Sequence, residues 1–86
     1  MKNDFFNILN SRYNKMSKGQ KRIADYLLAN YQQASFMTAS ALGQTVGVSE
    51  STVVRFATEF GFDGYPDFQD NLREMMKMRL TSVERI

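Results

Sequence analysis

The sequence predicts an all-α fold, a compact bundle of about five helices. Apolar residues recur at intervals of three and four along much of the chain, the period of a helix that packs one face on a core. No segment shows the alternation of apolar and polar residues that is typical of a half-buried strand. With 86 residues and a hydrophobic content of 43%, the chain is long enough for one small core and too short for a second.

The first two helices are expected over residues 4–12 and from Ser17 to about Asn30. The first is short and rich in apolar residues, and we expect it to cover the core. Ser17 followed three residues later by Gln20 is a capping-box pattern, in which two side chains satisfy unpaired backbone N–H groups at the start of a helix. The apolar stripe of the second helix, the expected main scaffold, consists of Ile23, Tyr26, Leu27 and Tyr31.

Connecting segments are expected at two further places. Residues 32–37 should lead to the third helix and carry Phe36 inward. Gly61 is of the residue type that ends a helix, and Gly64 permits a turn shortly after it. Pro66 suits the first position of the last helix, because the N–H group that proline lacks would be unpaired there.

The last helix is expected to run toward Leu80. Asp67 and Asp70 near its start are favourable, because the N-terminal end of a helix carries partial positive charge. Its apolar residues include Phe68, Leu72 and three methionines. An adaptable binding surface is one use for methionines, but we interpret these as core and dimer-contact residues: Met75, Met76 and Met78.

Residues 38–60 have the pattern of two short helices bent sharply around Gly47. Thr38 and Ser49 are each suited to cap the N-terminus of one helix, and Gly47 is expected to adopt a positive φ at the turn. Each helix has one apolar stripe to bury: Leu42 and Val46 on the first; Val53, Phe56, Ala57 and Phe60 on the second. This is the sequence pattern of a DNA-reading helix-turn-helix.

The second helix of this pair leaves a polar face outward, with short hydroxyl side chains and one guanidinium. Such groups reach base edges in the major groove, and we expect Arg55 to be the main base reader, because guanidinium pairs with guanine through two hydrogen bonds. The alternative is a plain helical hairpin with a solvated face, on which Arg55 only pairs with Glu59. The base-reading candidates are Ser49, Ser51, Thr52, Val54 and Arg55.

Positive charge is concentrated in the first half of the chain. The net charge is +2 over 86 residues, yet residues 12–22 contain five cations and no acid. This segment is a candidate phosphate-contacting patch; the alternative is a solvated loop and helix start. The predicted phosphate contacts are Lys18, Lys21, Arg22 and Thr38.

The composition argues against most enzyme classes. The chain has neither cysteine nor histidine, which removes disulfides, zinc fingers, thiol nucleophiles and imidazole acid-base chemistry. A hydrolase using Asp67 and Asp70 is a poor alternative, because the helix dipole explains both carboxylates. No cofactor, metal or catalytic residue is expected. Without a signal-peptide pattern or a long apolar run, we expect a cytoplasmic protein with no membrane contact.

Three segments together resemble the N-terminal domain of RpiR-type transcriptional regulators: residues 17–30, 46–62 and 64–72. The resemblance implies a DNA-binding domain over residues 1–80, with 81–86 beginning a linker to a sugar isomerase-like domain that lies outside this chain. A sugar-phosphate effector would bind only that domain. The family's DNA-reading positions match Ser49, Ser51, Thr52 and Arg55. Gly43 departs from the family pattern, which often has alanine at this position. Glycine inside a helix lowers helix stability, unless close packing with the second helix requires it.

The leading hypothesis is therefore sequence-specific binding of double-stranded DNA, as a homodimer on a palindromic site, in a regulator of sugar-phosphate metabolism. A second hypothesis is a helical protein-interaction module that has the helix-turn-helix shape without DNA affinity. The low net charge and the acidic second half of the chain support this alternative.

Overall fold

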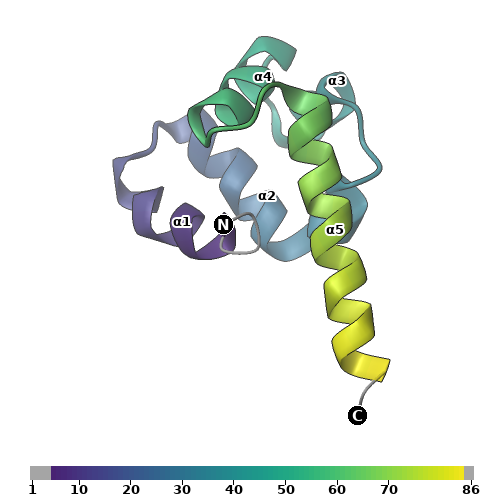
Figure 1. Cartoon of the computed structure of the whole chain (residues 1–86). Coiled ribbons are helices and arrows are strands. Elements are labelled where there is room, and N and C mark those ends of the chain that lie inside the picture. The colour runs from purple at the N-terminus through teal and green to yellow at the C-terminus, as the bar shows by residue number, and fades with distance from the viewer. Residues whose placement is uncertain (1–4, 85–86) are drawn as a thin grey trace.

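The protein's structure is a computed structural model that describes the backbone of residues 5–84. The described part contains five α-helices, one 3₁₀ turn and no strand, so the predicted all-α fold is confirmed. The elements in chain order are α1 (Phe5–Arg12), η2 (Tyr13–Lys15), α2 (Lys18–Ala34), α3 (Ala39–Val46), α4 (Glu50–Glu59) and α5 (Tyr65–Glu84) (Figure 1).

Helix α2 is the scaffold, since α3, α4 and α5 all pack against it. The core contains side chains from each of these helices, all fully buried: Ile23, Leu27, Leu42, Val53, Phe56, Phe68 and Leu72. Helix α1 covers this core as expected. Its Phe5 ring makes edge contacts with the rings of Phe60, Phe62 and Phe68, at centroid distances of 5.5–6.0 Å.

Helix α2 begins where the sequence predicts and continues past its predicted end. The Ser17 hydroxyl accepts a hydrogen bond from the Gln20 N–H, and the Gln20 side chain accepts one from the Ser17 N–H. At Asn30 the backbone leaves the helical region, with φ −139° and ψ 38°, and the helix then resumes to Ala34. The predicted end of the helix is in fact this kink.

The expectation that Phe36 points inward is wrong. Its side chain is 67% exposed, and the Arg73 guanidinium lies 5.9 Å from the centre of its ring. The neighbouring Ala34 and Ser35 are fully buried instead. These two small residues fill the space beneath the connection between α2 and α3, so the large ring stays at the surface.

Two of the three predicted turn glycines have positive φ, Gly47 at 83° and Gly61 at 92°. Gly64 does not have a positive φ. Its role is to start α5, because its carbonyl oxygen accepts the first helical hydrogen bond, from the Phe68 N–H. Pro66 consequently stands at the second position of α5, one later than predicted. An N–H group at this position would also have no partner within the helix, so proline is still tolerated.

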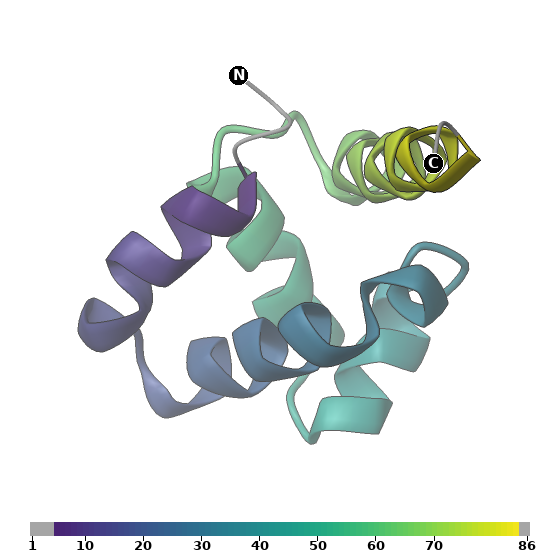
Figure 2. The same cartoon turned by 90° about the horizontal axis from the view of Figure 1, so that it is seen from below.

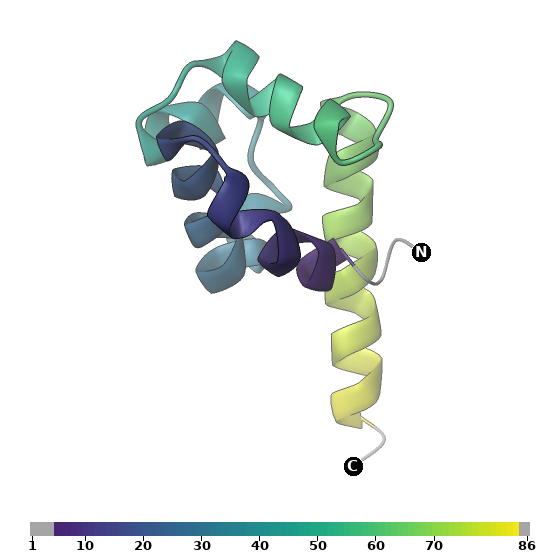
Figure 3. The same ribbon diagram turned by 90° about the vertical axis from the view of Figure 1, so that its left-hand side faces the viewer.

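Helix α5 is the longest described element, about 30 Å for its 20 residues. Its first half packs on the bundle, and its second half extends beyond the other helices (Figures 1 and 3). Figure 2, in which α5 is seen nearly end-on, shows it standing at one side of the bundle. Met75 is partly buried against the core, whereas the side chains of Met76 and Met78 lie outside the described residues, as do residues 1–4 and 85–86.

Candidate nucleic-acid interface

The turn between α3 and α4 is closed by one carbonyl group. The Gly43 carbonyl oxygen accepts hydrogen bonds from the N–H groups of Gly47 and Val48, both at 2.8 Å. Gly43 itself lies under the turn, since a β-carbon there would come within 2.7 Å of the Val48 carbonyl oxygen. Close packing with the turn therefore favours glycine at this position.

Three hydroxyl groups gather at the start of α4. Ser49 caps the helix by accepting a hydrogen bond from the Thr52 N–H at 3.2 Å. Its oxygen also lies 3.1 Å from the Ser51 hydroxyl and 2.8 Å from the Thr52 hydroxyl. A hydroxyl both donates and accepts, so this cluster can bond to base edges or to phosphate at the positive end of the helix dipole.

The outer face of α4 forms a shallow surface depression lined by Glu50, Ser51, Val54, Arg55 and Thr58. The Arg55 guanidinium is exposed, and within residues 5–84 no hydrogen bond or ion pair engages it. The alternative role for Arg55 requires Glu59, whose carboxylate instead accepts a 2.6 Å hydrogen bond from the Gln20 side chain. Arg55 is thus available to a ligand.

The five predicted base-reading residues lie on one end of α4 but are not equally accessible. Ser49, Ser51 and Arg55 are exposed, whereas Thr52 and Val54 are partly buried. Thr52 turns toward α2, where its methyl group would lie 3.9 Å from a β-carbon on Gly19.

Glu50, which was not among the sequence candidates, shares the outer face with Arg55. The sequence contained a signal for this, because residues four apart lie on the same face of a helix and Glu50 stands four residues before Val54. A carboxylate there can accept a hydrogen bond from the N4 amino group of cytosine.

The cations of the basic segment, residues 12–22, have different surroundings. Lys18 is exposed at the start of α2, and Arg22 donates a long 3.4 Å hydrogen bond to the Gly47 carbonyl oxygen, across the helix-turn-helix corner. Lys21 lies over the ring of Tyr13 at 5.4 Å. Arg22 therefore lies beside the turn, Lys18 is exposed at the start of α2, and Lys21 is directed toward the Tyr13 ring.

Arg12, another cation of the basic segment, belongs to the opposite end of α4. It donates a 3.2 Å hydrogen bond to the Glu59 carbonyl oxygen and lies 5.0 Å from the centre of the Phe60 ring. Its charge is thereby used to hold the C-terminal end of α4 on α1.

Thr38 stands at the far end of α3 from the turn. Its hydroxyl accepts a 3.0 Å hydrogen bond from the Ala41 N–H and so caps the helix. The side chain remains exposed, about 13–14 Å from Gly47 along the helix axis. Exposed polar groups thus lie at both ends of α3, with Thr38 at its start and the hydroxyl cluster of Ser49 and Ser51 beyond its end.

Nothing in the described part of the chain forms a metal site, because no three acidic side chains cluster there. The search for membrane spans over the same residues finds no helix of sufficient length and apolarity. What the arrangement offers is a helix with hydroxyl, guanidinium and carboxylate groups on its outer face.

Comparison with known families agrees with this geometry. The family described as "Helix-turn-helix domain, rpiR family" matches residues 4–79. The chain belongs to this family. It is thus a DNA-binding helix-turn-helix domain of the transcription-regulator class, the function that the sequence predicts.

The relatives are longer proteins named as transcriptional regulators. The chain is 37% identical over 68 residues to the HTH-type transcriptional regulator HexR of Pseudomonas aeruginosa, covering 79% of this chain and 24% of that protein. It is 29% identical over 62 residues to the regulator GlvR of Bacillus subtilis, covering 72% and 24%. The chain therefore spans about a quarter of the length of these relatives.

A solved structure has the same architecture. The Vibrio vulnificus NanR protein, in complex with ManNAc-6P, superposes with a TM-score of 0.79 at 32% identity, covering 91% of this chain and 30% of NanR.

Proposed function

We propose that this domain binds double-stranded DNA sequence-specifically, with α4 lying in the major groove. The observation that carries the proposal is the free guanidinium of Arg55 on an exposed helix face that also presents hydroxyl groups. A recognition helix reads bases with residues near its N-terminus, and Arg55 stands in the second turn of α4. The domain acts by binding and not by catalysis.

In this proposal the α4 residues divide their tasks by chemistry. Arg55 pairs with guanine O6 and N7, and Ser49 and Ser51 bond to base edges or to the nearest phosphate. Val54 gives apolar contact to a thymine methyl group. Thr52, which is partly buried, contributes mainly through its hydroxyl.

The phosphate backbone is contacted on both sides of α4. Lys18 and Arg22 approach it beside the turn, and Thr38 approaches it from the N-terminus of α3. Lys21 joins them if its side chain leaves the Tyr13 ring. These contacts add affinity and fix orientation, while the α4 face selects the sequence.

The operator is a palindrome read by a homodimer. A two-fold pair of helix-turn-helix domains reads two half-sites whose centres are about 34–36 Å apart, so the half-sites lie on the same face of the duplex.

The regulated genes belong to sugar-phosphate metabolism. NanR, a structural relative, is described in complex with ManNAc-6P. Because this chain matches only the DNA-binding portion of such relatives, a sugar-phosphate effector binds a part of the full-length protein outside residues 1–86, in the cytoplasm.

Selection of bound sequences from a random duplex library, followed by fluorescence anisotropy, tests the DNA-binding proposal. We expect one palindromic motif to be enriched and to bind about 10³-fold or more tightly than random duplex at moderate salt. Both affinities should fall as salt rises. Failure to bind any duplex at 50 mM salt would favour the protein-interaction alternative, whereas binding without enrichment would remove sequence specificity.

A further inference from the structure

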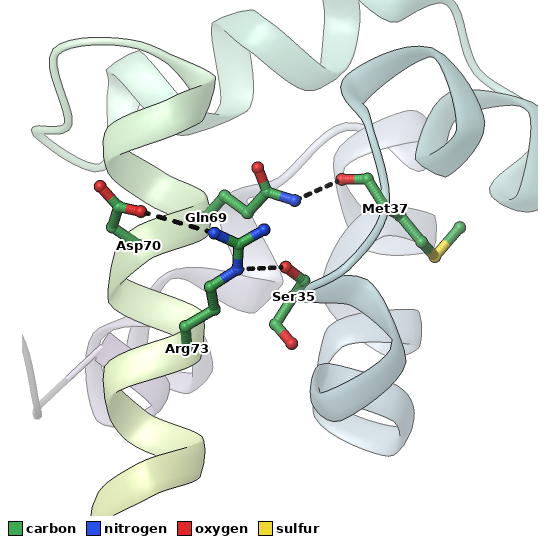
Figure 4. A network of polar contacts seen from close by, with 5 residues as sticks. All are labelled: Ser35, Met37, Gln69, Asp70 and Arg73. Atoms are coloured by element: carbon green, nitrogen blue, oxygen red, sulfur yellow. Dashed lines mark hydrogen bonds and ion pairs between the residues drawn. The ribbon is translucent and has the colours of Figure 1, made fainter.

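One stripe of α5 holds the connection between α2 and α3. The Tyr65 hydroxyl and the Gln69 side-chain N–H both donate to the Met37 carbonyl oxygen, at 2.6 and 3.0 Å. The Arg73 Nε–H donates to the Ser35 carbonyl oxygen at 3.1 Å. Figure 4 shows the Gln69 and Arg73 side chains reaching from α5 to the connection. The three donors are spaced by four residues, so they lie along one line on the helix.

These carbonyl groups lack any backbone hydrogen bond in the described structure. The N–H groups of Ser35, Phe36 and Met37 all return to carbonyl groups of α2. The carbonyl groups that follow the end of a helix have no such partner, and leaving them unpaired in a partly buried place is costly. Side chains of α5 supply the missing donors.

The Met37 carbonyl is of particular consequence because it belongs to the same rigid peptide plane as the Thr38 N–H. Fixing its oxygen with two donors fixes the direction in which the chain enters Thr38. Thr38 caps α3 in an extended conformation, φ −71° and ψ 164°, and it is the proposed phosphate contact at that end of the interface.

The register of the donors is set by the apolar stripe next to them. Phe68 and Leu72, both fully buried, anchor the first half of α5 in the core. Rotation of α5 or a slip by one residue would carry Tyr65, Gln69 and Arg73 away from the connection together.

We propose that Tyr65, Gln69 and Arg73 are positioning residues for DNA binding, which act by holding the Ser35–Met37 connection so that Thr38 meets the phosphate backbone. This inference rests on the proposed DNA-binding function. None of the three contacts DNA directly; they act through Thr38.

The first test needs no DNA. Gln69→Leu removes one donor from Met37 while keeping an aliphatic side chain, and amide hydrogen exchange reads the result. We expect the Ala41 and Leu42 amides, which are bonded to Thr38, to exchange about threefold to tenfold faster, while the Val53 amide in α4 serves as an internal reference. Gln32→Leu, the same change at an exposed α2 glutamine, should leave all three amides as they are.

The second test is a double-mutant cycle on DNA affinity. Thr38→Asp keeps a capping oxygen for α3 but removes the donor to phosphate and adds repulsion. We expect Gln69→Leu to weaken operator binding about threefold to tenfold in the wild-type background and less than twofold in the Thr38→Asp background. A structural role alone would give the same loss in both backgrounds.

The outcomes separate this inference from the proposed function. If exchange at Ala41 and Leu42 does not change relative to Val53, or the cycle is additive, the positioning role is wrong even though the domain binds DNA. If exchange changes as expected but the wild-type domain binds no duplex, the α5 side chains do hold the Ser35–Met37 connection. DNA binding, and with it their role in DNA binding, would then be overturned.

Discussion

Gly43 and Val48 approach each other so closely that a β-carbon on Gly43 would lie 2.7 Å from the Val48 carbonyl oxygen. Alanine favours a helix by about 1 kcal/mol over glycine, yet here it would push the turn away from α3. The packing effect is the larger one, because the obstacle is backbone that two hydrogen bonds hold in place.

Gly43→Ala should therefore lower the free energy of unfolding, by about 1–3 kcal/mol, as measured by urea denaturation. Gly19→Ala is the matched control: a β-carbon there would meet the Val48 side chain at an ordinary 3.4 Å, so stability should be unchanged or slightly higher. Equal stability of the Gly43→Ala variant and the wild type would show that the turn yields easily.

Gly47→Val should destabilise the fold by about 1–3 kcal/mol, because a β-branched side chain is strained at φ 83°. Its effect on DNA affinity should come only through loss of folded protein. Gly47→Asn, a residue type that tolerates positive φ, should retain most of the stability. Thermal melting checks both, and full stability of Gly47→Val with lost DNA binding would instead place Gly47 in the contact surface.

Replacing Lys18 and Lys21 by alanine should make the slope of log affinity against log salt less negative by about 1–2 and weaken operator and random DNA alike. Measured separately, Lys18 should contribute more, because Lys21 lies over Tyr13. Lys77→Ala removes the same charge from the extending half of α5 and should leave the slope unchanged. An unchanged slope for Lys18→Ala would place that lysine away from phosphate.

Burial raises the pKa of Tyr65 to about 12, although nearby Arg73 acts in the opposite direction. A tyrosine in the unfolded chain ionises near pH 10, so the stabilisation from the protonated hydroxyl is complete below about pH 10 and disappears as pH rises to about 12. Unfolding measured from pH 9 to pH 12 should show a steeper loss of stability for the wild type than for Tyr65→Phe. Parallel curves would mean that the Tyr65 hydroxyl ionises normally.

The features predicted correctly from sequence depend on neighbours in the chain. The capping roles of Ser17, Thr38 and Ser49 are set within three residues, and each is present. The positive φ of Gly47 follows equally from the local need to reverse direction. Local chemistry was sufficient to place the helix-turn-helix and its candidate face.

The features that sequence did not reveal depend on distant residues. Phe36 is apolar, and its surface position depends on the packing of Ala34 and Ser35 beneath the connection and on Arg73 of α5, which lies over its ring. The bonds from Tyr65 and Gln69 to Met37 cross 28 and 32 residues. Likewise, the aromatic neighbour of Lys21 comes from the fold around η2 and not from the charge pattern.

The base preference of the Arg55→Ala variant decides whether α4 reads DNA through this residue. Among the described residues no hydrogen bond or ion pair engages the Arg55 guanidinium, so thermal stability should be nearly unchanged. Affinity for the operator should fall by about 1–3 kcal/mol, and a panel of single base-pair changes should show lost preference at one position in each half-site.

Arg55→Lys is the matched control for that panel, because it keeps the charge but not the paired donors. It should retain salt-dependent binding and still lose the preference at that same position. If Arg55→Ala instead weakens operator and random DNA equally, with every base preference intact, Arg55 contacts phosphate and the proposed reading of DNA by α4 through this residue is wrong.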